Sequence, residues 1–439
     1  MRLEGLQILT MVPGAGILEG DLRIEQGRIT GVGRLENRAG EELRDLDGYT
    51  VIPGFVQGHI HLCQTLFRNL AEDLPLLDWL KQRIWPLEAA HDEESLRISA
   101  RLGLHELIRG GCTTFQSMET TRGTEFVFDE VLHSGLRGIL GNALMDVDAE
   151  GSAKGLTLST ARSLDLSVGL AKDWDGREGR IHYAWSPRFV LSCTEELLRE
   201  VSRLSEQTGQ RLHTHASEHP AEVARVQKIF GRTYIEALDD LALLGPRSSL
   251  AHCVHLGAPE MDLLQATGTS VLHCPSTNLK LGSGIAPILD YRKRGIAVAL
   301  GADGAPANNR LCPLTEMRQA ALLQQLVAGP GMMTAWDALE MATRGGAEAL
   351  GLLDECGTIE IGKSADLAFF DLRDPILGST ESPAEKLVWS AERAHLRAVM
   401  ARGRFLLDEG RIQVSHLEPQ SQSEIAGRSL RKLLDRASI

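Results

Sequence analysis

Apolar runs typical of β-strands alternate with helical patterns through the middle of the chain. The runs cover residues 51–59, 112–117, 136–142, 180–186, 211–217, 248–253, 269–274 and 296–303. Helical patterns lie between them, for example over residues 94–109, 194–208 and 221–230. Strands that alternate with helices indicate a parallel sheet, and eight such units predict an α/β fold of the (β/α)₈ TIM-barrel type.

Both ends of the chain have a different hydrophobic pattern, in which short apolar runs are separated by turns. Residues 6–11, 22–32, 365–372 and 398–407 are strand-like. We therefore expect residues 1–50 and 360–415 to assemble one small β-sandwich domain and residues 51–359 to form the barrel. Residues 416–439 are polar and then amphipathic, which predicts a tail that ends in a helix.

Histidines and one aspartate stand where the predicted barrel strands end. The ends carry His59 and His61, His215, His252, His273 and Asp303. Because the catalytic residues of such barrels lie at the C-terminal ends of the strands, these side chains are expected to share one site. His59 and His61 are two residues apart, so in a strand both imidazoles point to one face, as a metal site requires.

Three of the histidines have competing interpretations. His213 shares a strand face with His215, and we prefer His215 because it lies nearer the C-terminal end. His255 competes with His252, which could also be a hydrogen-bonded core histidine. His273 is expected to be structural.

Three imidazoles and a carboxylate make a ligand set that suits one divalent metal, Zn²⁺ before Fe²⁺. The expected ligands are His59, His61, His215 and Asp303. The alternative for Asp303, which precedes Gly304, is that it only begins a turn. A metal in such a site lowers the pKa of water towards neutrality. Glu218, just beyond a strand end, is expected to reach that water; the alternative is a polar surface loop.

Composition narrows the range of partners. The 439-residue chain has a net charge of −13, which argues against binding to nucleic acid or to anionic membranes. Its apolar runs are too short to cross a bilayer, and its first residues lack a signal-peptide pattern. Seven scattered cysteines without a CxxC pair indicate reduced thiols, so we expect a cytoplasmic protein.

These motifs together resemble the amidohydrolase superfamily, in its cytosine/guanine deaminase and triazine hydrolase branch. The resemblance extends from the N-terminal strands to residues 357–367 and rests on Pro53-Gly54-x₄-His59-x-His61, His215-x-x-Glu218, His252 and Asp303. It implies that His59, His61, His215 and Asp303 bind one metal and that Glu218, His252 and Asp303 are catalytic. Members with two metals carry a lysine on strand four, which residues 180–186 lack.

The resemblance implies a hydrolytic deaminase. Activated water attacks the ring carbon that bears the amine, and Glu218 delivers a proton to the adjacent ring nitrogen. His252 and Asp303 polarise the water and accept its proton. Triazine chlorohydrolases lack the glutamate, so Glu218 favours an amine as the leaving group. A catalytically inactive relic of the fold would have an incomplete set of these residues. Relatives are commonly dimers, so a homodimer is expected.

Several positions resemble the pocket of guanine deaminase. Gln64, Trp79, Arg188 and Phe189 match an amide, an indole, a guanidinium and a phenyl ring that hold the purine there. Such groups suit a flat, oxygenated heterocycle. Trp79 could instead pack within a helix, and Arg188 could form a salt bridge at the barrel rim. Guanine is therefore the first substrate expected, with a small heterocyclic amine and water as the only partners.

Other positions resemble the methylthioadenosine/S-adenosylhomocysteine deaminases. A glutamate at the position of Glu88 binds ribose hydroxyls in those enzymes. They also carry a pocket histidine where this chain has Trp185, which is accordingly a further candidate for substrate contact. The alternative substrates are thus 5′-modified adenosines: 5′-deoxyadenosine, methylthioadenosine and S-adenosylhomocysteine. Pterins and s-triazines are more remote choices.

Overall fold

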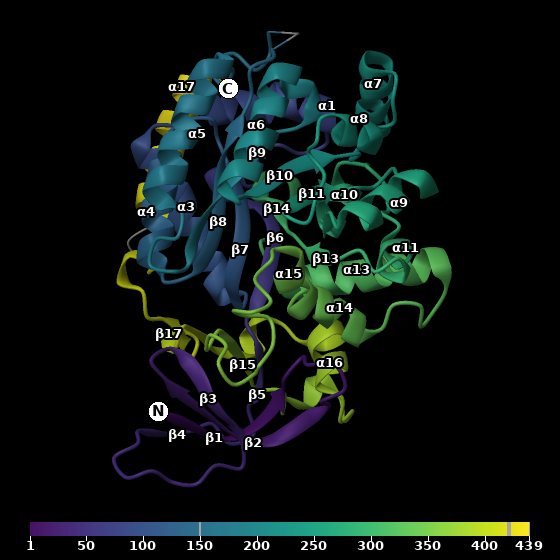
Figure 1. The fold of residues 1–439 in the computed structure, drawn as a ribbon. Helices are drawn as coiled ribbons and strands as arrows, with labels where there is room; N and C mark the ends of the chain where they lie inside the picture. The colour runs from purple at the N-terminus through teal and green to yellow at the C-terminus, as the bar shows by residue number, and fades with distance from the viewer. Residues whose placement is uncertain (149–150, 419–422, 439) are drawn as a thin grey trace.

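A parallel sheet closed into a barrel forms the centre of the molecule (Figure 1). The computed structural model describes residues 1–148, 151–418 and 423–438. The barrel strands are β6 (Phe55–His61), β7 (Cys112–Glu119), β8 (Arg137–Leu144), β9 (Ile181–Pro187), β10 (Arg211–Ala216), β11 (Ser248–His252), β12 (Ser270–His273), β13 (Val298–Leu300) and β14 (Asp303–Gly304). β14 pairs with β6 and completes the circle, so the predicted TIM-barrel fold is confirmed.

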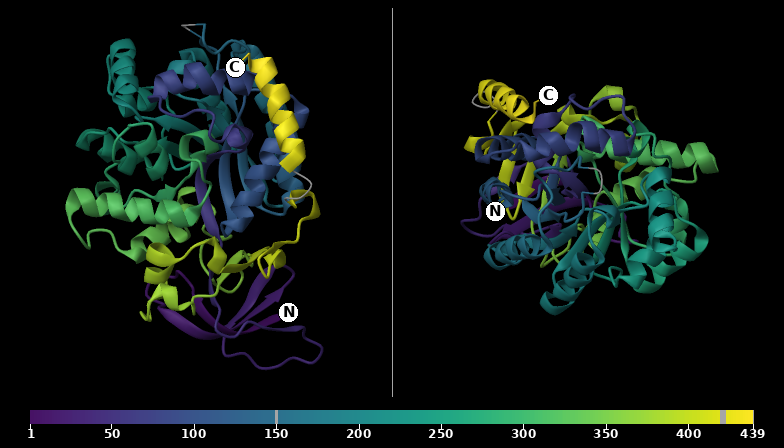
Figure 2. Two further views of the ribbon diagram at one scale, coloured as in Figure 1. Left: turned by 180° about the vertical axis from the view of Figure 1, so that it is seen from behind. Right: turned by 90° about the horizontal axis from the view of Figure 1, so that it is seen from above.

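Helices surround the strands, as the view from above shows (Figure 2). The larger ones are α3 (Glu93–Arg109), α4 (Thr124–Ser134), α5 (Thr160–Trp174), α6 (Glu195–Thr208), α7 (Pro220–Phe230), α9 (Ala258–Thr267) and α13 (Pro313–Ala328). The side chains of Asp92, Ser159 and Thr194 cap the first amides of α3, α5 and α6. The helices predicted over residues 94–109, 194–208 and 221–230 correspond to α3, α6 and α7. They are confirmed to within one residue at each end.

The last predicted strand, residues 296–303, is interrupted in the structure. Gly301 separates β13 from β14, and a Cβ atom there would lie 2.8 Å from the carbonyl oxygen of His59. Only glycine allows the two backbones to approach so closely. This contact brings Asp303 beside the end of β6.

The first predicted strand, residues 51–59, is wrong as a single element. It is split between two sheets, because β5 (Thr50–Pro53) pairs with β1 and β15 while β6 starts the barrel. The break falls at Gly54, where a Cβ atom would lie 2.2 Å from Oγ1 of Thr113. The apolar run is continuous because both strands are buried, so its pattern does not reveal the change of sheet.

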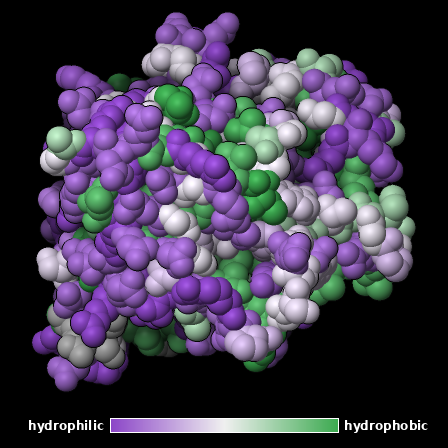
Figure 3. Space-filling view, turned by 90° about the horizontal axis from the view of Figure 1, so that it is seen from below, coloured by the Kyte–Doolittle hydropathy of each residue, from purple (hydrophilic) through white to green (hydrophobic). Residues whose placement is uncertain are grey.

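A second sheet joins both ends of the chain. Its strands run in the order β18 (Arg411–Ile412), β17 (Arg404–Asp408), β16 (Leu396–Ala401), β15 (Leu367–Phe370), β5, β1 (Arg2–Leu9), β2 (Ile17–Glu25) and β3 (Arg28–Gly33), and β4 (Leu43–Asp45) pairs with β1. Residues from both ends share one hydrophobic core. The face of the molecule seen from below is mostly hydrophilic, with smaller apolar patches (Figure 3). The domain boundaries expected from the sequence stay a prediction.

The segment after β6 forms short helices: η1 (Leu62–Phe67), α1 (Leu76–Trp79), the π-helix η2 (Leu80–Ile84) and α2 (Trp85–Ala89). The C-terminal helix α17 (Ser423–Ala437), yellow in Figure 2, packs against η1, α2 and α3. No helix in the described part of the chain is both long and apolar enough to span a membrane.

Candidate metal centre and substrate cavity

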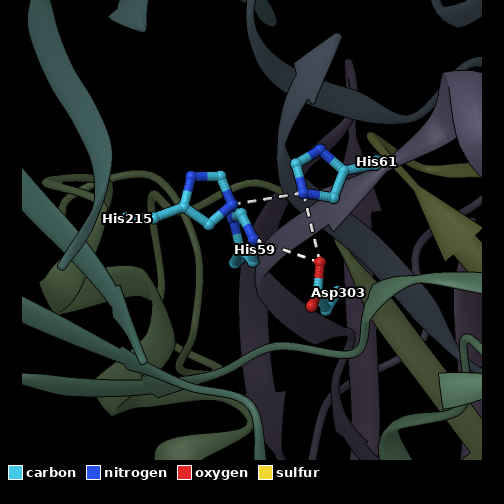
Figure 4. Close-up of side chains that lie close together, drawn as sticks. All are labelled: His59, His61, His215 and Asp303. Atoms are coloured by element: carbon cyan, nitrogen blue, oxygen red, sulfur yellow. Dashed lines mark hydrogen bonds and ion pairs between the residues drawn. The ribbon is translucent and has the colours of Figure 1, made fainter. Parts of the chain in front are cut away.

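Four side chains from three places in the barrel converge at its C-terminal end (Figure 4). Nε2 of His59 and Nε2 of His61 lie 3.4 and 3.1 Å from Oδ1 of Asp303. Nε2 of His215 lies 3.4 Å from Nε2 of His61. One ligand atom from each residue falls within 4.8 Å of all the others, a spacing and donor set that fit a single divalent ion.

The second nitrogen of each ligand histidine is held by a neighbour. Nδ1 of His61 donates to the carbonyl oxygen of Met118 at 2.6 Å, and Nδ1 of His215 donates to that of Arg188 at 2.7 Å. Because a carbonyl can only accept, each ring in its neutral form carries its proton on Nδ1 and leaves Nε2 unprotonated and directed at the shared centre. Nδ1 of His59 lies 2.9 Å from Nε2 of His213. His213, the alternative to His215 in the sequence analysis, therefore lies behind the expected ligand His59.

The backbone is strained where it presents these residues. His252 and Asp303 have φ angles of 73° and 59°, and Ser217 has 51°. Such left-handed conformations are unfavourable for residues with a Cβ atom and gather at functional sites. In β6, the four residues from Gln57 to Ile60 face only three in β7, Phe115 to Ser117, and this bulge redirects the strand end.

A carboxyl group and an imidazole lie beside the cluster. Oε2 of Glu218 is 3.5 Å from Nε2 of His252, and Ser283 donates to Oε1 at 3.4 Å. Burial, with Asp303 and Glu222 nearby, raises the pKa of Glu218 well above its usual value. The raised pKa favours the protonated form of this carboxyl group, the form that can donate a proton.

His252 has the complementary character. Burial lowers its pKa, and its Nδ1 lies 2.9 Å from Oδ1 of Asn278. Donation to this oxygen leaves Nε2 free to accept a proton. Although burial alone would raise the pKa of Asp303, the close contacts of its carboxylate with the imidazoles of His59 and His61 hold it well below its usual value. The centre thus contains an ionised ligand, a neutral base and a protonated acid.

A narrow cavity opens next to these groups. Its polar lining includes His61, Gln64, Arg188, His215, Glu218, Glu222, His252 and Asp303, and its apolar lining consists of Leu76, Trp79, Leu80, Phe189 and Leu281. Of the residues proposed from the sequence to contact substrate, Gln64, Trp79, Arg188 and Phe189 line it. The indole nitrogen of Trp79 donates to the carbonyl oxygen of Ala71 at 3.1 Å, which holds the ring in place.

Glu88 lies directly behind two of the lining residues. Its Oε1 accepts a hydrogen bond from Gln64 at 2.7 Å, and its Oε2 accepts one from Nη1 of Arg188 at 2.6 Å. Nη2 of Arg188 also donates to Oε1 at 3.1 Å. We call Gln64, Glu88 and Arg188 the polar cluster. Arg188 therefore forms the salt bridge considered from the sequence, but inside the cavity wall rather than at an exposed rim.

Trp185 does not reach the cavity. Alternation along β9 turns Ala184 towards the barrel interior and Trp185 outwards. There the indole nitrogen faces Oγ1 of Thr208 on α6 at 3.4 Å, and the ring packs edge-on against Tyr183. The expected substrate contact of Trp185 is therefore corrected to packing between sheet and helix.

Sequence reasoning missed several residues of the cavity. Glu222 accepts a hydrogen bond from the backbone amide of Glu218 at 3.0 Å and one from Tyr234 at 2.7 Å. Its place four residues after Glu218, at the start of α7, was a signal that could have been used. Leu76, Leu80 and Leu281 carry no such signal, because only packing decides which leucines face a cavity.

Comparison with known proteins decides the family. The sequence matches the amidohydrolase family over residues 50–406. The chain belongs to the amidohydrolase family. It is 36% identical over 418 residues to a protein of Methanothermobacter thermautotrophicus named 5′-deoxyadenosine deaminase, covering 95% of each chain. It is also 36% identical to the 5-methylthioadenosine/S-adenosylhomocysteine deaminase of Halobacterium salinarum, covering 98% of this chain and 99% of that one.

Solved structures of related enzymes have the same fold as this amidohydrolase. An adenosine deaminase from Xanthomonas campestris with bound zinc superposes with a TM-score of 0.90 at 28% identity, covering 100% of this chain and 98% of that one. E. coli guanine deaminase superposes with a TM-score of 0.85 at 28% identity, covering 93% and 99%. The expected family is confirmed, and the protein is a hydrolytic deaminase, an enzyme that acts on C–N bonds.

Proposed function

We propose that the enzyme deaminates 5′-modified adenosines, of which 5′-deoxyadenosine and methylthioadenosine fit best. The observation that carries this proposal is the polar cluster. Gln64 and Arg188, the groups expected to hold guanine, are already hydrogen-bonded to Glu88. The names of the relatives, deaminases of 5′-deoxyadenosine and of methylthioadenosine or S-adenosylhomocysteine, also favour the nucleosides over guanine.

The polar cluster can accept hydrogen bonds from a sugar. Although burial would raise the pKa of Glu88, Arg188 lowers it, so the carboxylate is charged. A carboxylate has about four acceptor positions, and the three hydrogen bonds from Gln64 and Arg188 leave one. Oε1 of Gln64 is buried and has no partner among the described residues. Because Gln64 lines the cavity and Glu88 lies behind it, Oε1 of Gln64 is the acceptor that a ribose hydroxyl can reach directly.

The rest of the cavity suits the ends of such a nucleoside. Leu76, Trp79, Leu80, Phe189 and Leu281 offer apolar surface to the adenine ring and to a methyl or methylthio group at C5′. We therefore expect small apolar 5′ substituents to be preferred over the zwitterionic homocysteine of S-adenosylhomocysteine.

The reaction follows from the protonation states of the site. His59, His61, His215 and Asp303 would hold a divalent ion, for which three imidazoles and one carboxylate favour zinc, and the ion would lower the pKa of water so that hydroxide is available near neutral pH. His252 accepts a proton at Nε2, and the protonated Glu218 donates to the ring nitrogen next to the carbon that bears the amine. As the water oxygen bonds to that carbon, His252 passes the proton it accepted on to the amine. The C–N bond then breaks and ammonia leaves, while the remaining hydroxyl proton returns to Glu218.

A substrate panel tests the proposal. We expect ammonia release with kcat/KM at least about tenfold higher for 5′-deoxyadenosine and methylthioadenosine than for guanine, which corresponds to about 1.4 kcal/mol in transition-state binding. Turnover of guanine with no turnover of the nucleosides would overturn it and would favour the guanine-like features, Arg188 and Phe189 in the cavity wall. Metal analysis of the same preparation should find one zinc per chain; iron would contradict the choice of ion.

A further inference from the structure

The C-terminal helix α17 lies behind the wall of the substrate cavity. It runs beside the barrel towards the end that carries the candidate metal centre (Figure 2, left). Leu433 is completely buried there, in a hydrophobic cluster with Phe67 and Leu87. Leu66, Ala90 and Ile98 complete the buried part of this cluster. The helix thus buries residues of η1, α2 and α3 together.

Arg436 adds polar contacts at the junction of α2 and α3. Its Nε donates to the carbonyl oxygen of Ala90 at 2.7 Å, and its Nη1 lies 2.9 Å from Oδ2 of Asp92. Ala90 ends α2, and Asp92 caps the first turn of α3. One side chain from the tail therefore satisfies the end of one helix and contacts the start of the next.

The residues that contact α17 are close in sequence to Gln64 and Glu88 of the polar cluster. Phe67 lies one turn after Gln64 in η1, and Leu87 is the neighbour of Glu88 in α2. Leu433 therefore packs on the same two short helices that carry the hydrogen-bonded pair Gln64 and Glu88. Between the contacts of Arg436, Nε2 of His91 donates to the carbonyl oxygen of Cys63 at 2.8 Å. The tail, the α2–α3 junction and η1 form one connected unit.

We propose that α17 positions Gln64 and Glu88 for substrate binding, with Leu433 and Arg436 as positioning residues. The short segments between η1 and α3 lack long helices of their own, so contacts from outside must fix them. Packing from Leu433 sets their distance from the barrel, and Arg436 fixes the end of α2 two residues beyond Glu88. The inference rests on the proposed function only in the choice of nucleoside as substrate.

The kinetic test compares two substitutions on the same face of one helix. Arg436→Gln removes the contacts to Ala90 and Asp92, whereas Lys432→Gln removes an exposed ion pair to Glu94 at 2.8 Å on α3. We expect Arg436→Gln to raise KM about three- to tenfold, the effect of about one hydrogen bond, with kcat changed less than about twofold. Lys432→Gln should leave both constants unchanged. Equal effects of the two variants would overturn the inference.

Hydrogen–deuterium exchange separates this inference from the substrate assignment. In Arg436→Gln and in Leu433→Ala, we expect faster amide exchange in residues 62–68 and 85–92, with the barrel strands unaffected. Unchanged exchange in those segments would overturn the inference whatever the substrate is. If the panel instead identifies guanine as the substrate, the proposed function fails, and the KM comparison is made with guanine.

Discussion

Burial sets the chemistry of individual side chains at the candidate metal centre. It raises the pKa of Glu218 and lowers that of His252, although their side chains lie only 3.5 Å apart. A protonated carboxyl group and a neutral imidazole are the acid and base that deamination needs near neutral pH.

The acid role that we propose for Glu218 predicts a specific loss. Glu218→Gln keeps the shape of the side chain but removes the transferable proton, so kcat should fall by about 10²- to 10⁴-fold while the metal content stays unchanged. Ammonia release and metal analysis measure the two quantities. Glu196→Gln, at an exposed position on α6, is the matched control and should leave activity intact. Activity that survives in Glu218→Gln would refute the assignment.

The polar cluster predicts a cost in both stability and binding. Glu88→Gln leaves the buried guanidinium of Arg188 without its charge partner, which should reduce the free energy of unfolding by about 3–5 kcal/mol. The KM for 5′-deoxyadenosine should rise about tenfold or more. Denaturant titration and steady-state kinetics measure these effects.

An exposed ion pair provides the comparison for Glu88. Glu72 pairs with Lys280 at 2.7 Å on the surface, so Glu72→Gln should cost at most about 1 kcal/mol and leave KM unchanged. Similar losses in the two variants would mean that Glu88 has no special part in the cavity wall.

At the scale of elements, buried carboxylates join segments that are distant in sequence. Glu316 on α13 accepts hydrogen bonds from Oγ of Ser276 and from Nδ2 of Asn308 at 2.7 and 2.8 Å. These partners belong to α10 (Pro275–Lys280) and α12 (Ala305–Asn308), the helices that follow β12 and β14. Glu316 on α13 thereby ties down α10, which carries Asn278, and the segment that follows Asp303.

Glu316 predicts a pH-dependent term in stability. Burial raises its pKa to about 7, whereas an unfolded glutamate titrates near 4.3. The folded protein therefore holds this proton more tightly. The contribution of Glu316 to the free energy of unfolding is fully present below about pH 4.3 and falls by about 3 kcal/mol as the pH rises to about 7. Glu316→Gln cannot lose a proton, so its Tm relative to the wild type should rise between pH 5 and pH 8. A difference that does not change with pH would contradict this.

At the scale of the whole molecule, a metal site links β6, β10 and the end of the last barrel strand. An ion that binds only the folded protein stabilises it by about 2.7 kcal/mol when its free concentration is about 100 times its dissociation constant. Removing it also leaves Asp303 buried between imidazoles without its ion.

Chelation should therefore abolish ammonia release and lower Tm, and added Zn²⁺ should restore both. The control is His61→Ala, which lacks a ligand and should show no shift of Tm with the chelator. An unchanged Tm of the wild type after verified metal removal would contradict a bound ion that stabilises the fold. The expected homodimer stays a prediction, which the mass of the protein in solution would test.

The sequence by itself was enough to predict the barrel, the family and the four side chains that lie together at the candidate metal centre. The reason is physical: strand alternation is local, and the carboxyl ends of parallel strands must meet at one rim. His59, His61, His215 and Asp303 could therefore be grouped without coordinates.

Only the tertiary structure decided how side chains pair across that rim. Gln64 and Glu88 pointed from sequence to different substrates, yet they are hydrogen-bonded to each other. Trp185 turned outwards, and Leu433, far along the chain, packs behind the cavity wall. Such contacts join residues that no short-range pattern relates, because burial and charge pairing depend on which surfaces the completed fold brings together.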